Sequence, residues 1–137
     1  MFRKIVETCI YSSELEMLKD FYINKIGLQF VSEEHGRHVF LKAGKNMLLI
    51  FNPDNTSNKK QNIFPPHGAF TPPASVHFAL EIEKEDYENA INLLLQSKIK
   101  IEKELTWENE KLKSIYFRDP SGNLVEFITK GNWPIED

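Results

Sequence analysis

The chain has 137 residues and a formal net charge of −3, which disfavours nucleic acid as a partner because phosphate binding needs a basic surface. Hydrophobic residues make up 41% and charged residues 27% of the composition, a balance typical of a globular domain and not of a disordered chain. The single cysteine, Cys9, excludes an internal disulfide, and no apolar run resembles a signal peptide or a membrane span. We therefore expect a cytoplasmic protein without a membrane segment.

The first part of the chain, residues 4–52, carries the pattern of one β-α-β-β-β module. Four strands are expected in it, at residues 5–11, 28–32, 37–42 and 47–52. The helix falls between the first two strands. Ser13 followed three positions later by Glu16 predicts a capping box at its start, and Gly27 is placed to end it. Apolar side chains share one face of this helix: Leu15, Leu18, Phe21 and Tyr22.

Residues 53–73 are rich in proline, asparagine, serine and lysine, and they are expected to form a linker loop. The pattern of the first module then returns in residues 74–130, and residues 131–137 form a tail. Strands are expected at residues 76–82, 99–104, 112–118 and 123–128. A helix is expected at residues 85–97, with an apolar face made by Tyr87, Ala90, Ile91, Leu94 and Leu95. The predicted fold is a single α+β domain of two tandem β-α-β-β-β modules.

Glu7 and His77 occupy the same place in the two modules, 70 residues apart, which indicates an internal duplication. Aligning "GNLVEF" with "KNMLLI" puts Glu126 opposite Leu49. The two modules therefore share a pattern of strands and helices but differ in their polar residues.

Four polar residues fall on strand faces that are not expected to pack against the helices, because side chains alternate along a strand: Glu7, His77, Tyr116 and Glu126. Three of them, Glu7, His77 and Glu126, have a simpler explanation when taken alone. Glu7 can pair with Lys4, and Glu126 with Arg118 or Lys130, while a lone histidine in a strand is more often a structural polar group than a metal ligand.

The four residues are harder to explain separately when they are considered together. If the two modules curve one sheet around a cavity, these residues can converge there. Two carboxylates and one imidazole in one cavity need a cation between them. The sequence therefore predicts a divalent metal site made by Glu7, His77 and Glu126.

Three segments resemble the vicinal-oxygen-chelate superfamily, which includes glyoxalase I, extradiol dioxygenases, fosfomycin-resistance proteins, methylmalonyl-CoA epimerase and bleomycin-binding proteins. "ETCIYSSELEMLKDFYINKIGLQF" is similar to its first strand and helix, "VHFALEI" to its fifth strand, and "SIYFRDPSGNLVEF" to its C-terminal signature. The resemblance covers roughly residues 4–130. It implies a curved mixed sheet around a cavity, a small-molecule substrate and, commonly, a homodimer.

The resemblance also implies a ligand set. Metal-dependent members carry a ligand on the first strand, a histidine on the fifth and a glutamate on the last, which match Glu7, His77 and Glu126. The first ligand is more usually a histidine, so Glu7 is a departure. The fourth ligand of glyoxalase I, a glutamate on the fourth strand, matches Leu49 here, which argues against a standard glyoxalase I.

The expected metal is a divalent Mn, Fe, Ni or Zn ion, and Mg also suits the site. One imidazole and two carboxylates make a hard donor set, which differs from the thiolate ligands of a structural zinc site. Tyr116 resembles the tyrosine that contacts substrate in extradiol dioxygenases, although the preceding "LTWENEKLK" lacks the histidine of those enzymes. Tyr116 and Glu126 are therefore expected to be catalytic. The residues expected to bind substrate are Arg37, His67, Tyr116 and Arg118.

Two functions remain open on these grounds. The first is a metal-dependent enzyme acting on a small substrate with vicinal oxygens, as a lyase, an isomerase or a dioxygenase. The alternative is a metal-free protein that binds a small molecule or drug, as bleomycin-resistance proteins do. A thiol transferase similar to the fosfomycin-resistance enzymes is a third possibility, but its anion site cannot be recognised in the sequence.

Overall fold

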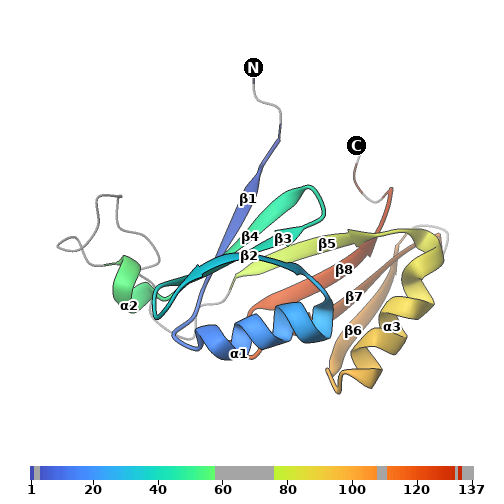
Figure 1. Cartoon of the computed structure of the whole chain (residues 1–137). Coiled ribbons are helices and arrows are strands. Elements are labelled where there is room, and N and C mark those ends of the chain that lie inside the picture. Colours follow the sequence, from blue (N-terminus) through green and yellow to red (C-terminus); the bar gives the residue numbers. More distant parts are fainter. Residues whose placement is uncertain (2–3, 58–75, 108–110, 132, 134–137) are drawn as a thin grey trace. The chain divides into compact units, whose positions relative to one another are not determined.

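The computed structural model describes residues 1, 4–57, 76–107, 111–131 and 133. The chain separates into two compact units, unit 1 (Met1–Ser75) and unit 2 (Val76–Asp137), and each carries one module (Figure 1). Within the described ranges, no helix combines the length and apolar character needed to cross a membrane.

Unit 1 is a four-stranded mixed sheet with a helix on one face. The strand order is β1-β4-β3-β2, with β1 parallel to β4 and the other neighbours antiparallel. The elements are β1 (Glu7–Tyr11), α1 (Leu15–Asp20), a π-helical turn (Phe21–Ile26), β2 (Gln29–Glu34), β3 (His38–Ala43), β4 (Asn46–Phe51) and α2 (Pro53–Thr56).

Unit 2 repeats this topology. Its strand order is β5-β8-β7-β6, again with one parallel pair, β5 and β8, and antiparallel neighbours elsewhere. The elements are β5 (His77–Ile82), a 3-10 turn (Lys84–Asp86), α3 (Tyr87–Gln96), β6 (Ile101–Trp107), β7 (Leu112–Arg118) and β8 (Leu124–Thr129). The predicted tandem β-α-β-β-β modules are confirmed.

Strand register inside each sheet gives the same equivalence as the sequence repeat. Leu49 in β4 pairs with the residue two places after Glu7, and Glu126 in β8 pairs with the residue two places after His77. Glu7 and His77 thus hold matching positions in their sheets, and so do Leu49 and Glu126. The predicted alignment of Leu49 with Glu126 is therefore confirmed.

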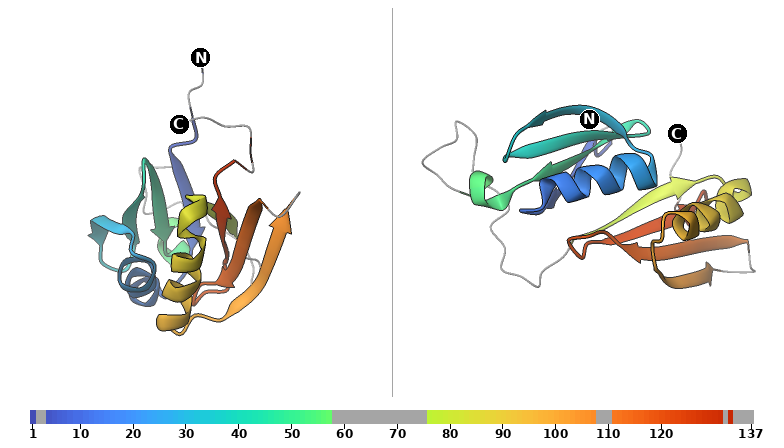
Figure 2. Two further views of the ribbon diagram at one scale, coloured as in Figure 1. Left: turned by 90° about the vertical axis from the view of Figure 1, so that its right-hand side faces the viewer. Right: turned by 60° about the horizontal axis from the view of Figure 1, so that its bottom comes forward.

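The core of unit 1 lies between α1 and the inner face of its sheet (Figure 2). Leu18 and Tyr22 on the helix side, and Leu41 and Ile50 on the sheet side, are fully buried, as the predicted apolar face requires. Removing an aliphatic side chain such as Leu18, Leu41 or Ile50 from water stabilises the folded state by about 1.5–3 kcal/mol. This burial fixes which sheet face meets the helix, so the alternate residues of each strand must lie on the opposite face.

The end of the first helix follows the prediction and its start does not. Gly27 adopts a left-handed conformation (φ 93°), and its N–H bonds to the Tyr22 carbonyl, which closes the π-helical turn. The predicted capping box of Ser13 and Glu16 is wrong, because no side chain caps α1. Instead, the Ser12 hydroxyl accepts a hydrogen bond from the Glu14 N–H at 2.9 Å, so the chain turns one residue earlier than expected.

The second helix is shorter than predicted, because residues 84–86 form a 3-10 turn and α3 begins only at Tyr87. Tyr87, Ala90 and Leu94 are buried as expected. The expectation that Leu95 belongs to the buried face is wrong, since this residue is 60% exposed. Leu94 occupies the centre of the buried stripe, and its neighbour is turned about 100° away from it on a helix of 3.6 residues per turn.

The segment expected to be a linker opens with the short helix α2. The Asn52 side chain caps this helix by accepting a hydrogen bond from the Asp54 N–H at 3.0 Å, and Pro53 occupies its first turn. Residues 58–73 of the expected linker lie outside the described part of the chain.

Candidate functional site

A tight turn between β7 and β8 aligns the strands that carry the candidate site. The Asp119 carboxylate is buried and accepts hydrogen bonds from the N–H groups of Ser121 and Asn123, both at 2.9 Å, and from the Asn123 side-chain amide at 2.7 Å. The Asn123 side-chain oxygen in turn accepts from the Val76 N–H at 3.1 Å. The "RDPSGN" turn therefore joins the start of β8 to the start of β5 and fixes the register between them.

His77 and Glu126 meet on the sheet face opposite α3. His77 begins β5, and Glu126 lies in the middle of the neighbouring strand β8. His77 Nε2 is 3.3 Å from Glu126 Oε2, with the histidine side chain 49% exposed and the glutamate side chain 7% exposed. The predicted proximity of these two residues is therefore present within unit 2.

A backbone contact determines which nitrogen of His77 carries the proton and which nitrogen presents a lone pair to Glu126. His77 Nδ1 lies 3.1 Å from the Leu124 carbonyl oxygen. A carbonyl oxygen only accepts hydrogen bonds, so Nδ1 carries a proton. In a neutral imidazole, Nε2 then presents its lone pair to the carboxylate. Two electron-rich atoms face each other unless a proton or a metal cation lies between them.

Tyr116 on β7 contacts Glu126 from the other side. The two residues are directly paired across the strands, and the Tyr116 hydroxyl hydrogen-bonds to the Glu126 carboxylate. Burial, followed by this hydrogen bond and the charge of Glu126, raises the pKa of Tyr116 above 10, while a hydrogen bond with Ser114 lowers it. The net result is a tyrosine that keeps its proton at neutral pH and acts as a donor to Glu126.

The third expected ligand, Glu7, lies in unit 1. It is the first residue of β1, it is exposed, and it pairs with Met47 of β4. Within the described residues of either unit, no group of three or more histidine, cysteine, aspartate or glutamate side chains is close enough to hold a metal ion. The described residues of unit 2 therefore offer no more than two ligands at one place, His77 and Glu126.

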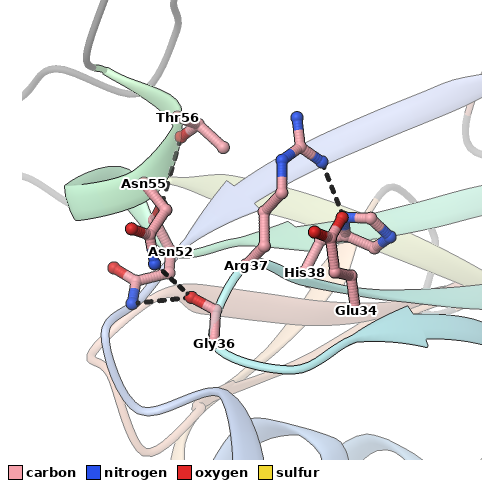
Figure 3. A network of polar contacts seen from close by, with 7 residues as sticks. All are labelled: Glu34, Gly36, Arg37, His38, Asn52, Asn55 and Thr56. Carbon is pink, nitrogen blue, oxygen red and sulfur yellow. Dashed lines mark hydrogen bonds and ion pairs between the residues drawn. The ribbon is translucent and has the colours of Figure 1, made fainter. Parts of the chain in front are cut away.

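Both arginines expected to bind substrate have partners of their own. Arg118 donates from Nε to Glu102 at 2.8 Å and from Nη1 to the Gly122 carbonyl at 3.1 Å. Arg37 lies in unit 1 beside His38, with 2.7 Å between Arg37 Nη1 and His38 Nδ1 (Figure 3). His67, the fourth residue expected to bind substrate, lies outside the described residues.

Two features of the site were missed from the sequence. The first is Ser114, which is fully buried and whose hydroxyl contacts Tyr116. Ser114 and Tyr116 are two residues apart and so lie on the same strand face, which strand alternation could have indicated. The Leu124 carbonyl fixes the His77 tautomer. No side-chain pattern signals a backbone contact of this kind, because it depends on the register between β5 and β8.

Comparison with known proteins places this chain in a family. The family model described as "Glyoxalase/Bleomycin resistance protein/Dioxygenase superfamily" matches residues 4–127. A crystal structure of lactoylglutathione lyase from Agrobacterium tumefaciens is 33% identical, with 97% of this chain and 98% of that chain covered and a TM-score of 0.88.

A glyoxalase/bleomycin resistance protein/dioxygenase from Nocardioides shares the fold at 18% identity, with 100% and 91% of the two chains covered and a TM-score of 0.74. None of the curated proteins that were searched matches the chain. The family model spans nearly all of both modules, including both strands of the His77–Glu126 pair. The chain therefore belongs to the glyoxalase/bleomycin resistance protein/dioxygenase superfamily.

Proposed function

We propose that this protein is a divalent-metal-dependent enzyme that acts on a small substrate with two neighbouring oxygen atoms, by lyase, isomerase or dioxygenase chemistry. The observation that carries the proposal is the 3.3 Å separation of His77 Nε2 and Glu126 Oε2, with the other imidazole nitrogen tied to a backbone carbonyl. Histidines that bind metals usually donate their second N–H in this way, which fixes the tautomer of the ring.

The separation of the two atoms can be compared with a direct hydrogen bond and with a shared cation. A charge-assisted N–H···O bond between an imidazolium and a carboxylate is about 2.7–2.9 Å long. Two ligand atoms at adjacent positions of a metal, each with a bond of about 2.0–2.2 Å, lie about 3 Å apart. The observed 3.3 Å is longer than either, so the tautomer of His77, and not the distance, supports a shared cation. The donor set in unit 2 thus fits a metal ion held by one nitrogen and one oxygen.

Glu7 is the proposed third ligand. It occupies in unit 1 the sheet position that His77 occupies in unit 2, and its side chain is exposed. Two carboxylates and one neutral imidazole balance the charge of a divalent ion, and hard oxygen donors suit Mn, Fe, Ni or Mg. When bound, such an ion supplies a Lewis acid that can chelate two substrate oxygens and stabilise negative charge on them.

The remaining residues of the site have distinct proposed roles. Tyr116 holds the Glu126 carboxylate in place by donating its proton, and the raised pKa of Tyr116 keeps that donor available above neutral pH. Glu126 is the proposed base, because it is a buried carboxylate in contact with Tyr116. Arg37, His67 and Arg118 remain proposed substrate contacts.

Lactoylglutathione lyase chemistry is the first reaction to test, because the relative of 33% identity carries that name. Leu49 holds in unit 1 the position that Glu126 holds in unit 2, so the first module offers no carboxylate there. Three protein ligands leave more positions open to substrate oxygens than four would. We therefore expect a substrate that chelates the metal through two atoms.

Metal binding by purified protein tests the proposal. We expect the wild type to bind one divalent ion per chain in calorimetric titrations with Mn, Ni and Zn, and His77→Ala, Glu126→Gln and Glu7→Gln each to weaken binding at least tenfold. His35→Ala and Glu14→Gln alter exposed residues outside the site and serve as matched controls.

The alternative function, metal-free binding of a small molecule, has one observation in its favour. A protonated His77 would also satisfy the contact with Glu126 as an ion pair, without any metal. Absence of stoichiometric metal binding by the wild type would support this alternative. Affinity that persists in all three ligand variants would contradict the proposed site.

A further inference from the structure

The turn between β2 and β3 in unit 1 is held unusually firmly for a surface hairpin. The Gly36 carbonyl accepts hydrogen bonds from the side-chain amides of Asn52 at 3.2 Å and Asn55 at 2.5 Å, as Figure 3 shows. The Arg37 carbonyl accepts from the Asn52 N–H at 2.8 Å, and the Arg37 N–H donates to the Glu34 carbonyl at 3.0 Å. These bonds fix the backbone on both sides of Arg37.

The Arg37 side chain is held over an aromatic surface. Its guanidinium carbon is 5.8 Å from the centre of the Phe51 ring, within the range of a cation–π contact. The ring of His38 stacks on Phe40 with 4.0 Å between centroids and meets Phe51 edge-on at 5.9 Å. We call these four residues, Arg37, His38, Phe40 and Phe51, the Arg37 cluster.

The hydrogen bond between Arg37 and His38 does not neutralise the positive charge of Arg37. Arginine only donates, so His38 Nδ1 must accept the 2.7 Å bond and the ring is neutral in this arrangement. Burial and the neighbouring Arg37 both lower the pKa of His38, while Glu34 raises it, which agrees with a neutral ring. The Glu34 carboxylate is 3.9 Å from His38 Nδ1.

Arg37 differs in this respect from Arg118, the other arginine whose surroundings the structure describes. Arg118 forms an ion pair with Glu102, with 2.8 Å between the charged atoms. Arg37 forms no ion pair with any carboxylate of the described residues, and its only side-chain hydrogen bond among them goes to a neutral acceptor. A half-buried guanidinium that is oriented by one N–H retains further donors for an anion.

We propose that the Arg37 cluster binds an organic anion, a carboxylate joined to an apolar or aromatic body. The guanidinium would take the carboxylate oxygens through its remaining N–H donors, a geometry in which arginine excels. The half-buried ring of Phe40 would contact the apolar body, while the buried ring of Phe51 supports the guanidinium from below. His38 orients the guanidinium and supplies no charge of its own that would compete with it.

The anion site deepens the proposed role of Arg37 as a substrate contact, but it does not depend on the proposed metal centre. All four residues of the cluster belong to unit 1, and none of them is a proposed metal ligand. Loss of metal binding would therefore leave the anion site intact, and failure of the anion site would leave the metal proposal intact.

Titration with benzoate, followed by NMR of the His38 and arginine side-chain resonances, tests the proposal. We expect benzoate to bind the wild type and to shift these resonances, and the neutral analogue benzamide to bind at least about tenfold more weakly, since the charge is lost. Arg37→Gln should weaken benzoate binding at least tenfold. Lys45→Gln, the matched control, removes an exposed positive charge of unit 1 outside the cluster and should leave benzoate binding unchanged.

Thermal unfolding of each variant shows whether the fold is retained. If Arg37→Gln does not fold, Arg37→Lys replaces it; this variant keeps the charge but cannot offer two parallel N–H donors, so weaker benzoate binding is expected. The proposal is overturned if the wild type does not bind benzoate, if benzamide binds equally well, or if the folded Arg37 variant retains wild-type affinity.

Discussion

His38 illustrates how neighbouring side chains determine the chemistry of one residue. Burial has the largest effect on its pKa and lowers it, Arg37 lowers it further, and Glu34 opposes both. The net direction is downward from 6.5, so the folded protein resists protonation of this ring. His38 contributes to stability at pH values above 6.5. That contribution falls as the pH drops from 6.5 through the lower folded-state pKa, because the unfolded chain takes up the proton first.

The pKa of His38 can be measured directly by following its ring protons in an NMR titration. We expect a midpoint below 6.5 in the wild type, a higher midpoint in Arg37→Gln and a lower midpoint in Glu34→Gln, since these variants remove opposing charges. Equal midpoints in the wild type and both variants would show that neither charge acts on the ring.

Tyr116 is the residue whose hydroxyl most directly supports the Glu126 carboxylate. Tyr116→Phe keeps the ring and removes the donor, so the buried carboxylate loses a hydrogen bond. We expect metal affinity to fall about 10- to 100-fold, as for other residues that orient metal ligands. Calorimetric titration of the two proteins measures this effect.

Tyr87→Phe is the matched control for that variant. It also removes a hydroxyl that hydrogen-bonds to a glutamate, in this case Glu104 at 2.7 Å, but this pair lies outside the site. Its metal affinity should equal that of the wild type. Comparable losses in both variants would indicate a general effect of destabilisation and not support of Glu126.

At the scale of elements, the turn between β7 and β8 links stability to the site. Asp119 accepts three hydrogen bonds there, and Asn123 passes the constraint on to Val76, next to His77. Strand β8 therefore cannot slip relative to β5 without breaking this set of bonds.

Asp119→Ala should lower the free energy of unfolding by about 2–4 kcal/mol, because it leaves buried donors without their charged acceptor. Denaturant unfolding measures the change, and metal affinity should fall with it as the register between His77 and Glu126 loosens. Asp54→Ala, at an exposed position of α2, should change stability by no more than about 0.5 kcal/mol. A similar loss in both variants would argue against a special role of this turn.

The sequence predicted elements well where a periodic pattern is reinforced by burial. Leu18 and Tyr22 repeat at helical spacing and are fully buried, and Gly27 ends the helical segment as expected. Helix starts were predicted less well. The choice between Ser12 and Ser13 as hydrogen-bond acceptor depends on where the chain leaves β1, and a local motif does not contain that information.

At the scale of the whole chain, the internal repeat explains what could be predicted of the site. The repeat aligned Leu49 with Glu126, and strand alternation put His77, Tyr116 and Glu126 on one face, as the structure of unit 2 has them. The contacts of Arg37 were not foreseen, because they depend on a hairpin and a helix cap that meet only in the folded protein. The part played by Glu7 stays a prediction.

The two units differ in polarity on equivalent sheet faces. Where unit 2 pairs Tyr116 with Glu126, unit 1 pairs Phe40 with Leu49. One module thus provides the hydrogen-bonding groups, and the other provides an aromatic surface with Arg37 at its end.

X-ray absorption spectroscopy of the nickel-loaded protein is the most direct test of the proposed metal centre. We predict one imidazole and otherwise oxygen ligands at about 2.0–2.2 Å, and loss of the imidazole signal in His77→Ala. A sulfur ligand from Cys9, two or more imidazoles, or an imidazole signal that persists in His77→Ala would contradict a centre built on His77 and Glu126.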